Sequence, residues 1–379
     1  MKVAYISNLP FADADFPLIR EMQIQGVEVD YFIYVTPYSH KATLANIQKL
    51  YPRQGILPVT VYKEFLTFKN YLNLKKVYVV NSLHRSDFHP ANLKTMLELL
   101  RRVWKYDVIH LTWPPRRNKL LFYFLRRKIV LTLHDPFPHS DKNCFEFELC
   151  RILAFKWISK IVLLNEKQKK LFVNHYHIPE RKVFLSRLGK YDCIRYVVPS
   201  NLMVPEEYVL FFGLIAPYKG IEYLLRAFER VHENFPKVKL LIVGSGKLYF
   251  DASLYRDKAY VEIWNRYISL NELSALLSRA KFTVCPYKDA TQSGVVQTAF
   301  SMGLPVVATD VGNFSDIVQE GKTGRIVPPN DVSALVDAMS DLLNNPSGLE
   351  QMRVYIENEW GIRNEWAPIV KQYLNVYSA

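Results

Sequence analysis

The sequence has few cysteines and no long apolar run. Only four cysteines occur in 379 residues, Cys144, Cys150, Cys193 and Cys285, and they match neither a paired zinc spacing nor a disulfide framework. We interpret them as reduced, structural thiols. No stretch approaches the roughly 18 consecutive apolar residues that a membrane-spanning helix needs, and the apolar run at residues 3–6 is too short for a signal peptide. The sequence therefore predicts a cytoplasmic protein whose membrane contact, if any, is peripheral and at the inner face.

The C-terminal half lacks the positive charge of the N-terminal half. Residues 1–195 contain 32 Lys and Arg against 16 Asp and Glu, whereas residues 196–379 contain 17 against 20. The net charge of +13 thus belongs to the first half, where it is densest at residues 101–128. Such a field attracts anionic partners. Nucleic acid, an anionic lipid surface and a phosphorylated acceptor all fit, as does an ordinary solvated face. No recognised nucleic-acid module accompanies the charge, so we expect no nucleic-acid partner.

Short β-rich runs alternate with helical patterns along the chain. Runs such as Val3–Ser7 and Val29–Tyr34 lack polar alternation, which is typical of strands covered on both faces in a parallel sheet. The alternation pauses at the proline-containing stretch 197–207, a candidate linker, and then restarts.

A chain of this length has more residues than one hydrophobic core usually supports. Open parallel sheets bind ligands beyond the carboxyl ends of their strands. We therefore predict an α/β fold of two doubly wound, Rossmann-like domains facing a cleft. The first domain comprises residues 1–195, the second residues 196–359, and residues 360–379 form a helix that crosses back to the first.

Strand-to-helix turns in the second half are rich in residues suited to phosphate. Lys219 follows a strand that ends at Gly213 and stands where the next helix begins, so its ammonium can meet a phosphate. In the next turn, Gly244 and Gly246 allow a ligand to approach the backbone closely.

The turn at residues 291–295 has a different chemistry. Ser293 is a candidate N-cap, and Gly294 begins a helix whose free N–H groups suit an anion. Simple helix capping is the alternative interpretation of this turn.

Together these blocks resemble glycosyltransferase family 4. Residues 213–220 are similar to the family's Gly-Arg-Leu-x-x-x-Lys-Gly segment, residues 301–312 to its Gly-x-Pro-Val-Val-Ala signature, and residues 321–331 to the block that follows. The resemblance covers the whole second half. It implies a retaining, metal-independent transferase with the glycosyltransferase-B fold, which uses a nucleotide sugar as co-substrate and needs no cofactor.

The resemblance also implies roles for individual residues. Lys219 and the amides of Ser293, Gly294 and Val295 are expected to hold the donor diphosphate. Arg266 and Tyr267 are expected to flank the nucleobase, and Gly244 and Gly246 to lie beside the nucleoside. Gly213 is expected to be a further donor-binding residue.

The sequence departs from the family pattern at three positions. The two glutamates that the family commonly carries align with Ala290 and Thr298, and the Arg expected after Gly213 is Leu214. A branch of the family carries a similar Ala-Thr-Gln-Ser-Gly-Val block, so we interpret the change as a subgroup trait. We expect Gln292 or Thr298 to supply replacement hydrogen bonds to the sugar or ribose.

In the first half, His134 follows a strand at a position that resembles a family loop facing the cleft. We expect it to contact the transferring sugar, with Asp135 positioning it; a purely structural histidine is the alternative, and it is favoured for His110 and His139. Two prolines between His134 and His139 prevent helical register, so we predict no metal.

Asp13 and Asp15 form an Asp-x-Asp triplet. This pattern binds metal in the other major glycosyltransferase fold. This match is weak, because such triplets are common. Either carboxylate could instead touch the acceptor hydroxyl.

The functional prediction is a retaining hexosyltransferase. It would move a sugar from a UDP-linked donor to a glycan or lipid-linked acceptor in surface polysaccharide or glycolipid synthesis, and the basic first domain could contact an anionic membrane. A non-catalytic nucleotide-sugar-binding partner protein and a sugar-nucleotide epimerase of the same fold are the alternatives.

Overall fold

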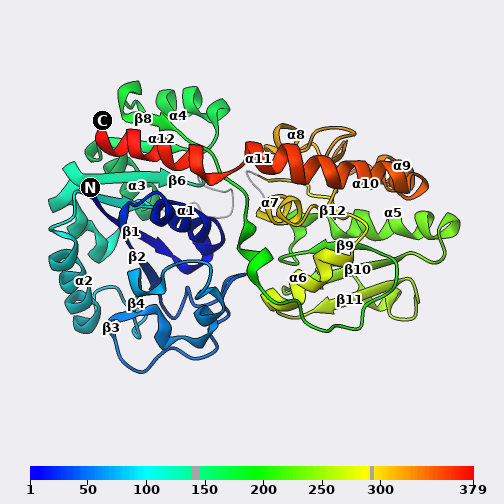
Figure 1. The fold of residues 1–379 in the computed structure, drawn as a ribbon, viewed down its shortest axis with the longest axis horizontal. Coiled ribbons are helices and arrows are strands. Elements are labelled where there is room, and N and C mark those ends of the chain that lie inside the picture. The colour runs from blue at the N-terminus through cyan, green and yellow to red at the C-terminus, as the bar shows by residue number, and fades with distance from the viewer. Residues whose placement is uncertain (138–144, 291–293) are drawn as a thin grey trace. The chain divides into compact units, whose positions relative to one another are not determined.

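A computed structural model describes residues 1–137, 145–290 and 294–379, with the backbone alone at 145–147. The chain divides into two compact units. The first consists of Met1–Gly189 together with Glu365–Ala379, and the second of Lys190–Asn364. Each unit is built around its own sheet (Figure 1).

The first unit contains a sheet of eight strands in the order β3-β4-β2-β1-β5-β6-β7-β8. Its strands are β1 (Lys2–Asn8), β2 (Glu28–Val35), β3 (Gly55–Pro58), β4 (Val77–Asn81), β5 (Val108–Leu111), β6 (Ile129–Leu133), β7 (Lys160–Leu163) and β8 (Val183–Leu185). All neighbours pair in parallel except β3 with β4. The predicted parallel sheet is present, with one antiparallel strand at its edge.

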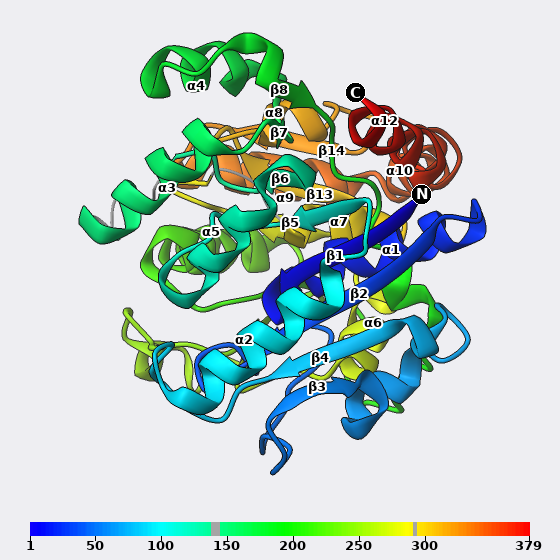
Figure 2. The ribbon, with the colours of Figure 1, turned by 90° about the vertical axis from the view of Figure 1, so that its left-hand side faces the viewer.

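Helices cover both faces of this sheet. They are α1 (Ala12–Ile24), α2 (Pro90–Val103), α3 (Phe145–Trp157), α4 (Lys169–Tyr176) and α12 (Trp366–Ser378), with the 3-10 segment η5 (Arg117–Lys128). Helices α1 and α12 pack against each other. The buried side chains of α2, η5, α3 and α4 share one core with the strands, and Figure 2 shows α2 and α3 on the viewer's side of the strands. Strand side chains alternate between the two helical layers, as in a doubly wound fold.

The C-terminal helix α12 is fastened to the sheet of the first unit by a buried histidine. His110 of β5 is fully buried. Its Nδ1 lies 2.5 Å from the Tyr377 hydroxyl, and its Nε2 lies 2.8 Å from Oγ1 of Thr132. Burial lowers the pKa of His110 to about 3, so the ring is neutral and its two nitrogens serve these two hydroxyls. His110 is therefore a structural residue.

The second unit contains a wholly parallel sheet in the order β11-β10-β9-β12-β13-β14. Its strands are β9 (Tyr208–Phe212), β10 (Lys239–Gly244), β11 (Val261–Asn265), β12 (Thr283–Cys285), β13 (Val306–Thr309) and β14 (Gly324–Val327). Its helices are α5 (Ile221–Asn234), α6 (Leu270–Arg279), α7 (Gly294–Ser301), α8 (Phe314–Ile317), α9 (Val332–Asn344), α10 (Pro346–Tyr355) and α11 (Gly361–Arg363). This is a second Rossmann-like domain.

The chain enters the second unit earlier than the proline-containing stretch indicates. The division falls between Gly189 and Lys190, whereas the sequence places it after residue 195. The short 3-10 turn η8 (Asp192–Tyr196) packs against α6 and α7, and the Ser200 amide donates to the Asn271 carbonyl. The correction therefore concerns residues 190–195, while the stretch 197–207 lies in the second unit as the predicted bounds have it.

Within the described ranges, no helix is both long and apolar enough to cross a bilayer.

Removing the Tyr377 hydroxyl should destabilise the first unit. In Tyr377→Phe the buried Nδ1 of His110 loses its partner, which costs about 1–3 kcal/mol in the free energy of unfolding. Urea unfolding followed by circular dichroism measures this cost. Tyr38→Phe is the matched control, because Tyr38 is 73% exposed and its loss should cost nothing measurable. Equal unfolding curves for the two variants would show that the bond does not hold α12.

Candidate active site

Lys219 is buried beside an aromatic ring at the carboxyl edge of the second sheet. It ends the 3-10 turn η9 (Pro217–Lys219) that follows β9 and is only 7% exposed. Its Nζ lies 3.6 Å from the centroid of the Tyr287 ring and 5.0 Å from that of Tyr218. Burial lowers the pKa of the Lys219 ammonium to about 8, and the nearby Cys285 opposes this shift. No described carboxylate forms an ion pair with the ammonium, so its charge is available to an anion.

The turn at Gly220 and the loop that follows β12 bring Lys219 and Tyr287 together. Gly220 has a φ of 65°, and a Cβ there would lie 2.0 Å from the Pro286 carbonyl oxygen. Any side chain at this position would push the two loops apart. The backbone of Tyr287 is held in turn by Thr309, whose Oγ1 donates to the Tyr287 carbonyl at 2.6 Å. The ammonium and the ring therefore meet because of backbone packing around them.

The predicted glycines bring neighbouring strand ends together. A Cβ on Gly244 would lie 1.7 Å from the Gly213 carbonyl oxygen, and one on Gly246 would lie 2.0 Å from the Ile215 carbonyl oxygen. Gly213 and Gly244 have φ values of 123° and 151°, a region that favours glycine. These glycines are therefore needed because neighbouring backbone lies against them. The sequence analysis instead expected a ligand to lie against Gly244 and Gly246.

Helix α7 begins at the same edge. A Cβ on Gly213 would lie 3.4 Å from Cγ2 of Val295, so the start of α7 adjoins the end of β9. Thr298 is buried, and its Oγ1 donates to the Gly294 carbonyl at 2.8 Å. That hydroxyl can accept a hydrogen bond from a ligand, but its proton is already used. Gln292 and Ser293 lie outside the described residues.

The predicted nucleobase residues follow β11. Arg266 is an exposed residue whose Nη2 donates to Glu272 Oε1 at 2.8 Å and whose Nη1 donates to the Tyr267 carbonyl at 3.0 Å. Its guanidinium is therefore held in place by Glu272. Asn265, which sequence reasoning missed, receives a hydrogen bond from the Gly246 amide and returns one to the Gly246 carbonyl, both at 3.1 Å.

The structure adds residues that no motif indicated. Tyr287 presents its ring to Lys219, and Asn265 fixes the loop at Gly246. Lys288 pairs with Glu222 at 2.8 Å beside the start of α5. These contacts join segments far apart in the chain, so sequence spacing carries no signal for them; only the short distance from Tyr287 to the end of β12 points toward the site.

In the first unit, His134 follows β6 and is half-buried. Its ring stacks on Phe11 with centroids 4.5 Å apart. Burial lowers the pKa of His134 to about 4, and the neighbouring Asp135 opposes the shift. At neutral pH the ring is uncharged, so it can exchange hydrogen bonds with a ligand but cannot supply a positive charge. A small pocket lies beside it, lined by Tyr5, Ala14, Asp15, Leu18, Thr132, His134, Leu164, Arg187, Leu188, Trp366 and Tyr373.

Asp15 points into the core of the first unit. It is 1% exposed and accepts hydrogen bonds from Tyr5 at 2.7 Å, Ser7 at 2.5 Å and Tyr31 at 2.8 Å. Burial raises its pKa to about 7. The expectation that it touches the acceptor hydroxyl is corrected here, because its oxygens are used by this network. Asp13 is half-buried, and burial raises its pKa to about 6. His139 lies outside the described residues.

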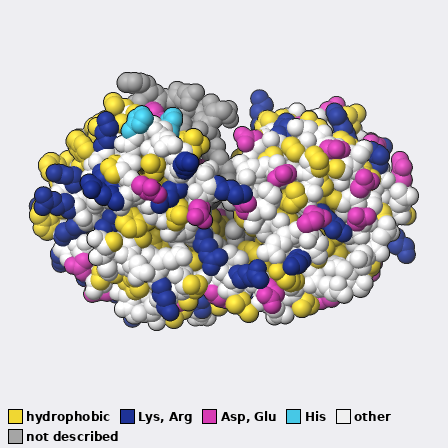
Figure 3. Space-filling model, turned by 90° about the horizontal axis from the view of Figure 1, so that it is seen from above, with side chains coloured by type: hydrophobic (Ala, Val, Ile, Leu, Met, Phe, Trp, Pro, Cys, Tyr) yellow, Lys and Arg dark blue, Asp and Glu magenta, His cyan; other side chains and the backbone are white. Residues whose placement is uncertain are grey.

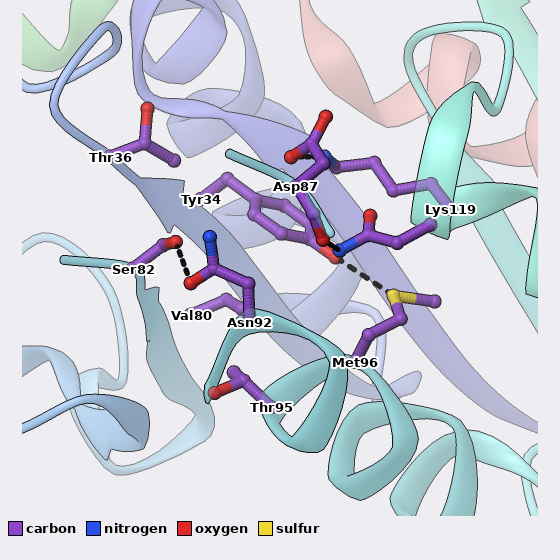
Figure 4. Close-up of a pocket in the computed structure, with 10 residues that line it drawn as sticks. Tyr34, Thr36, Val80, Ser82, Asp87, Asn92, Thr95, Met96 and Lys119 are labelled. Carbon is purple, nitrogen blue, oxygen red and sulfur yellow. Dashed lines mark hydrogen bonds and ion pairs between the residues drawn. The ribbon is translucent and has the colours of Figure 1, made fainter. Parts of the chain in front are cut away.

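A second pocket of the first unit opens at the carboxyl ends of β2 and β4 (Figure 4). Lys119 lies 3.4 Å from Asp87 Oδ1 and 5.0 Å from the Tyr34 ring centroid. Burial lowers the pKa of Lys119, and Asp87 opposes this. On the opposite side, Ser82 donates to Asn92 at 2.6 Å. The lining residues come from separate segments of the chain, so no local pattern in the sequence predicts this pocket.

Comparison with known proteins relates the second unit to glycosyltransferases. Residues 206–345 match the family model described as glycosyl transferases group 1. A phosphatidyl-myo-inositol mannosyltransferase of Mycobacterium leprae is 32% identical over 176 residues, which are 45% of this chain and 46% of that protein. The match thus spans about half the length of this relative. A GDP-mannose:glycolipid 4-beta-D-mannosyltransferase of Xanthomonas campestris is 28% identical over 325 residues, 83% of each chain.

Solved structures establish the fold. HepE of Anabaena, in complex with UDP and glucose, matches with a TM-score of 0.71 at 15% identity, covering 100% of both chains. Sucrose-phosphate synthase from Thermosynechococcus elongatus matches with a TM-score of 0.69 at 16% identity, covering 100% of this chain and 98% of that one. The chain has the glycosyltransferase-B fold, as predicted. The group 1 match supports a family 4 type, while the branch assignment stays a prediction.

The ring of Tyr287 should keep Lys219 charged. A cation over a ring face is stabilised by roughly 0.5–2 kcal/mol, so Tyr287→Leu should lower the Lys219 pKa further, by about one unit. Tyr287→Phe keeps the ring and should leave the pKa near that of the parent. NMR titration of the lysine side-chain carbons measures both. If the Leu and Phe variants titrate alike, the ring has no such role.

Asp15 should make the first unit less stable as pH rises. The pKa of Asp15 is higher in the folded than in the unfolded protein. Its contribution to the free energy of unfolding is therefore complete below about pH 4 and is lost as the pH approaches 7. The free energy of unfolding should fall by about 1 kcal/mol per pH unit in that window. Asp15→Asn should flatten this slope relative to the parent, whereas the same change at Asp13 should flatten it less. Urea unfolding at several pH values is the measurement; parallel slopes for Asp15→Asn and parent would contradict it.

Proposed function

We propose that the protein is a retaining glycosyltransferase. It moves a hexose from a UDP-linked donor to a glycan or lipid-linked acceptor in surface polysaccharide or glycolipid synthesis. The observation that carries the proposal is the buried Lys219 ammonium at the carboxyl edge of the second sheet, which pairs with no described carboxylate and lies within the region that matches glycosyl transferases group 1.

The donor diphosphate is proposed to lie between Lys219 and the start of α7. The first amides of a helix have no partners within the helix and carry its positive dipole end. The amides of Gly294 and Val295 stand at that end, and Ser293 belongs to the same turn in the sequence. When the sugar leaves, negative charge grows on the diphosphate, and fixed donors aimed at this charge lower the barrier. These groups supply the positive charge that a metal would otherwise provide, so the absence of a metal or cofactor requirement remains part of the proposal.

UDP is the proposed nucleotide. HepE, which shares the fold, was solved with UDP and with UDP-glucose, whereas the Xanthomonas relative is named for GDP-mannose. Arg266 and Tyr267 are proposed to flank the base, and the bond from Arg266 to Glu272 holds the guanidinium plane ready for stacking. Gly244 and Gly246 lie on the loop beside them, joined to Asn265.

Sugar recognition is proposed to depend on residues other than the usual glutamates. Ala290 and Thr298 occupy those positions, and Thr298 can only accept a hydrogen bond because it donates to Gly294. This leaves Gln292 as the proposed donor of hydrogen bonds to the sugar. Gln292→Ala should then weaken turnover, and unchanged turnover would remove it from the site.

On the acceptor side, the neutral His134 is proposed to hydrogen-bond a hydroxyl of the transferring sugar. Its lowered pKa suits this role, because a neutral imidazole offers one donor and one acceptor. Retention of configuration would follow from attack on the same face from which the diphosphate leaves, with a donor phosphate oxygen taking the acceptor proton. Both relatives described above have names that include lipid components, phosphatidyl-myo-inositol and glycolipid, which supports a lipid-linked acceptor at a membrane surface.

A screen of nucleotide sugars by thermal shift tests the proposal. A ligand at 100 times its dissociation constant adds about 2.7 kcal/mol of stability, so a UDP-sugar should raise the unfolding temperature. Lys219→Ala should weaken this binding ten- to a hundredfold, since a hydrogen bond to a charged group is worth about 1.5–3 kcal/mol. Lys258→Ala, an exposed lysine of the same unit, is the control. No shift with any UDP- or GDP-sugar would sink the proposal.

Three further measurements test the role of Lys219 and separate the alternatives. Affinity should fall above about pH 8, where the Lys219 ammonium loses its proton, and Lys219→Arg should remove this fall because arginine stays charged. Slow donor hydrolysis that Lys219→Ala abolishes favours an enzyme over a non-catalytic binding protein, which the two absent glutamates would otherwise favour. Release of an epimerised sugar without acceptor would indicate an epimerase.

A further inference from the structure

Three large aromatic side chains stand exposed on the helical layer of the first unit. Trp104, at the end of α2, is 62% exposed; Phe124, within η5, is 77% exposed; and Trp157, the last residue of α3, is 51% exposed. Large exposed apolar groups that gather on one surface commonly mark an interaction site.

The three aromatics come from elements that touch each other. Lys128 at the end of η5 donates from Nζ to the carbonyls of Trp104 at 2.8 Å and Tyr106 at 2.9 Å, which fastens η5 to the end of α2. Tyr123, the neighbour of Phe124, packs edge-on against Trp157 with ring centroids 5.0 Å apart. Figure 2 shows α2 and α3 on the same side of the sheet. The aromatics therefore belong to one continuous surface.

Unpaired cations surround these aromatics. The exposed basic residues of the same element ends are Arg101, Lys105, Arg126, Arg127 and Lys156. Across the described parts of the chain, none of these five has an ion pair or a side-chain hydrogen bond. We call the three aromatics and five cations the aromatic-basic surface. On the face drawn in Figure 3, Lys and Arg side chains gather with hydrophobic ones over the first unit.

Other basic residues nearby are committed to the fold. The Arg102 guanidinium lies 3.9 Å from the Tyr78 ring centroid, and Arg117 and Lys119 pair with Asp87 at 3.7 and 3.4 Å. Arg102 and Arg117 both lie in the stretch 101–128, where the sequence concentrates positive charge. Of the cations in that stretch, the structure leaves Arg101, Lys105, Arg126 and Arg127 without an ion pair to a described residue, and it adds Lys156 from α3.

The chemistry of this surface favours a lipid bilayer over other anionic partners. Tryptophan and phenylalanine insert their apolar rings at the level of lipid headgroups, and cations beside them attract anionic lipids. Within η5 there is no acidic residue to repel such a surface. Aromatic rings beside cations can also bind single-stranded nucleic acid, but no recognised nucleic-acid module accompanies this surface, so binding to nucleic acid is an outcome that the test below must exclude.

We propose that the aromatic-basic surface docks the protein on an anionic lipid bilayer. Trp104, Phe124 and Trp157 enter the headgroup layer, and the five cations lie against lipid phosphates. The docking stands apart from the chemistry of transfer, and if the proposed function also holds, it brings the protein to the surface where a lipid-linked acceptor resides.

Vesicle binding by the full-length protein tests the docking. The protein should sediment with vesicles of phosphatidylcholine mixed with phosphatidylglycerol, and binding to phosphatidylcholine alone should be at least about tenfold weaker because the cations then lack anionic lipid. Binding to the mixed vesicles should also weaken as salt rises. Equal binding to both vesicle types, or none to either, would overturn the proposal.

Paired variants locate the surface. Trp104→Ser with Phe124→Ser removes two aromatics, and Arg126→Gln with Arg127→Gln removes two charges; each pair should weaken binding to the mixed vesicles about tenfold or more. Arg226→Gln with Arg256→Gln removes the same charge from exposed positions of the second unit and should leave binding within about twofold of the parent. A control pair as damaging as the test pairs would show that net charge alone drives binding and would sink the assigned surface.

Two readouts keep this result separate from the proposed function. All variants should keep the parent's unfolding temperature and its thermal shift with nucleotide sugars, which excludes misfolding as the cause of lost vesicle binding. Failure of every nucleotide sugar to bind would remove the proposed function and leave the docking intact. Tighter binding to single- or double-stranded nucleic acid than to mixed vesicles would instead overturn the lipid assignment.

Discussion

The candidate site of the second unit depends on how closely its strand ends approach one another. Gly244 meets the Gly213 carbonyl, Gly246 meets that of Ile215, and Gly220 meets that of Pro286, each at a distance that leaves no room for a Cβ. This packing draws the loops after β9, β10 and β12 into one small region. Lys219 is buried there against Tyr287, and no carboxylate of residues 1–137, 145–290 or 294–379 pairs with it, which is a costly arrangement for an ammonium. A bound anion would offset that cost, so the packing that buries Lys219 also prepares it to bind an anion.

The first unit uses buried polar groups for a different purpose. Asp15 collects hydrogen bonds from three hydroxyls, and His110 joins the sheet to α12. Both residues are satisfied within the protein, and buried polar networks of this kind fix one arrangement of the elements they join. His134 differs, because its ring is only half-buried and stacks on Phe11. Among the described histidines and aspartates that the sequence selected in this unit, it remains the better candidate for contact with a ligand.

The strands of the second unit could be predicted closely, and those of the first only in part. The almost wholly apolar runs at 208–212 and 239–243 stand between turn signals, and their shortness favours strands over helices. The short strands β3, β7 and β8 could not be predicted, because three or four residues are too few to show a distinct period. The division between the units falls at Lys190 and not at residue 196, because the residues around η8 carry no local pattern that tells which unit they pack against.

The sequence by itself determined the fold class, the order of the phosphate-handling blocks and the concentration of positive charge in the first half, because these depend on residue types and local spacing. Tertiary structure alone decided which charges are free. Arg102 rests on Tyr78 and Arg266 is held by Glu272, whereas Lys219 meets only aromatic rings and the five cations beside Trp104 and Phe124 meet no partner in the described chain. A charge is neutralised or exposed by residues distant in the chain, and no local pattern records where those residues come to lie.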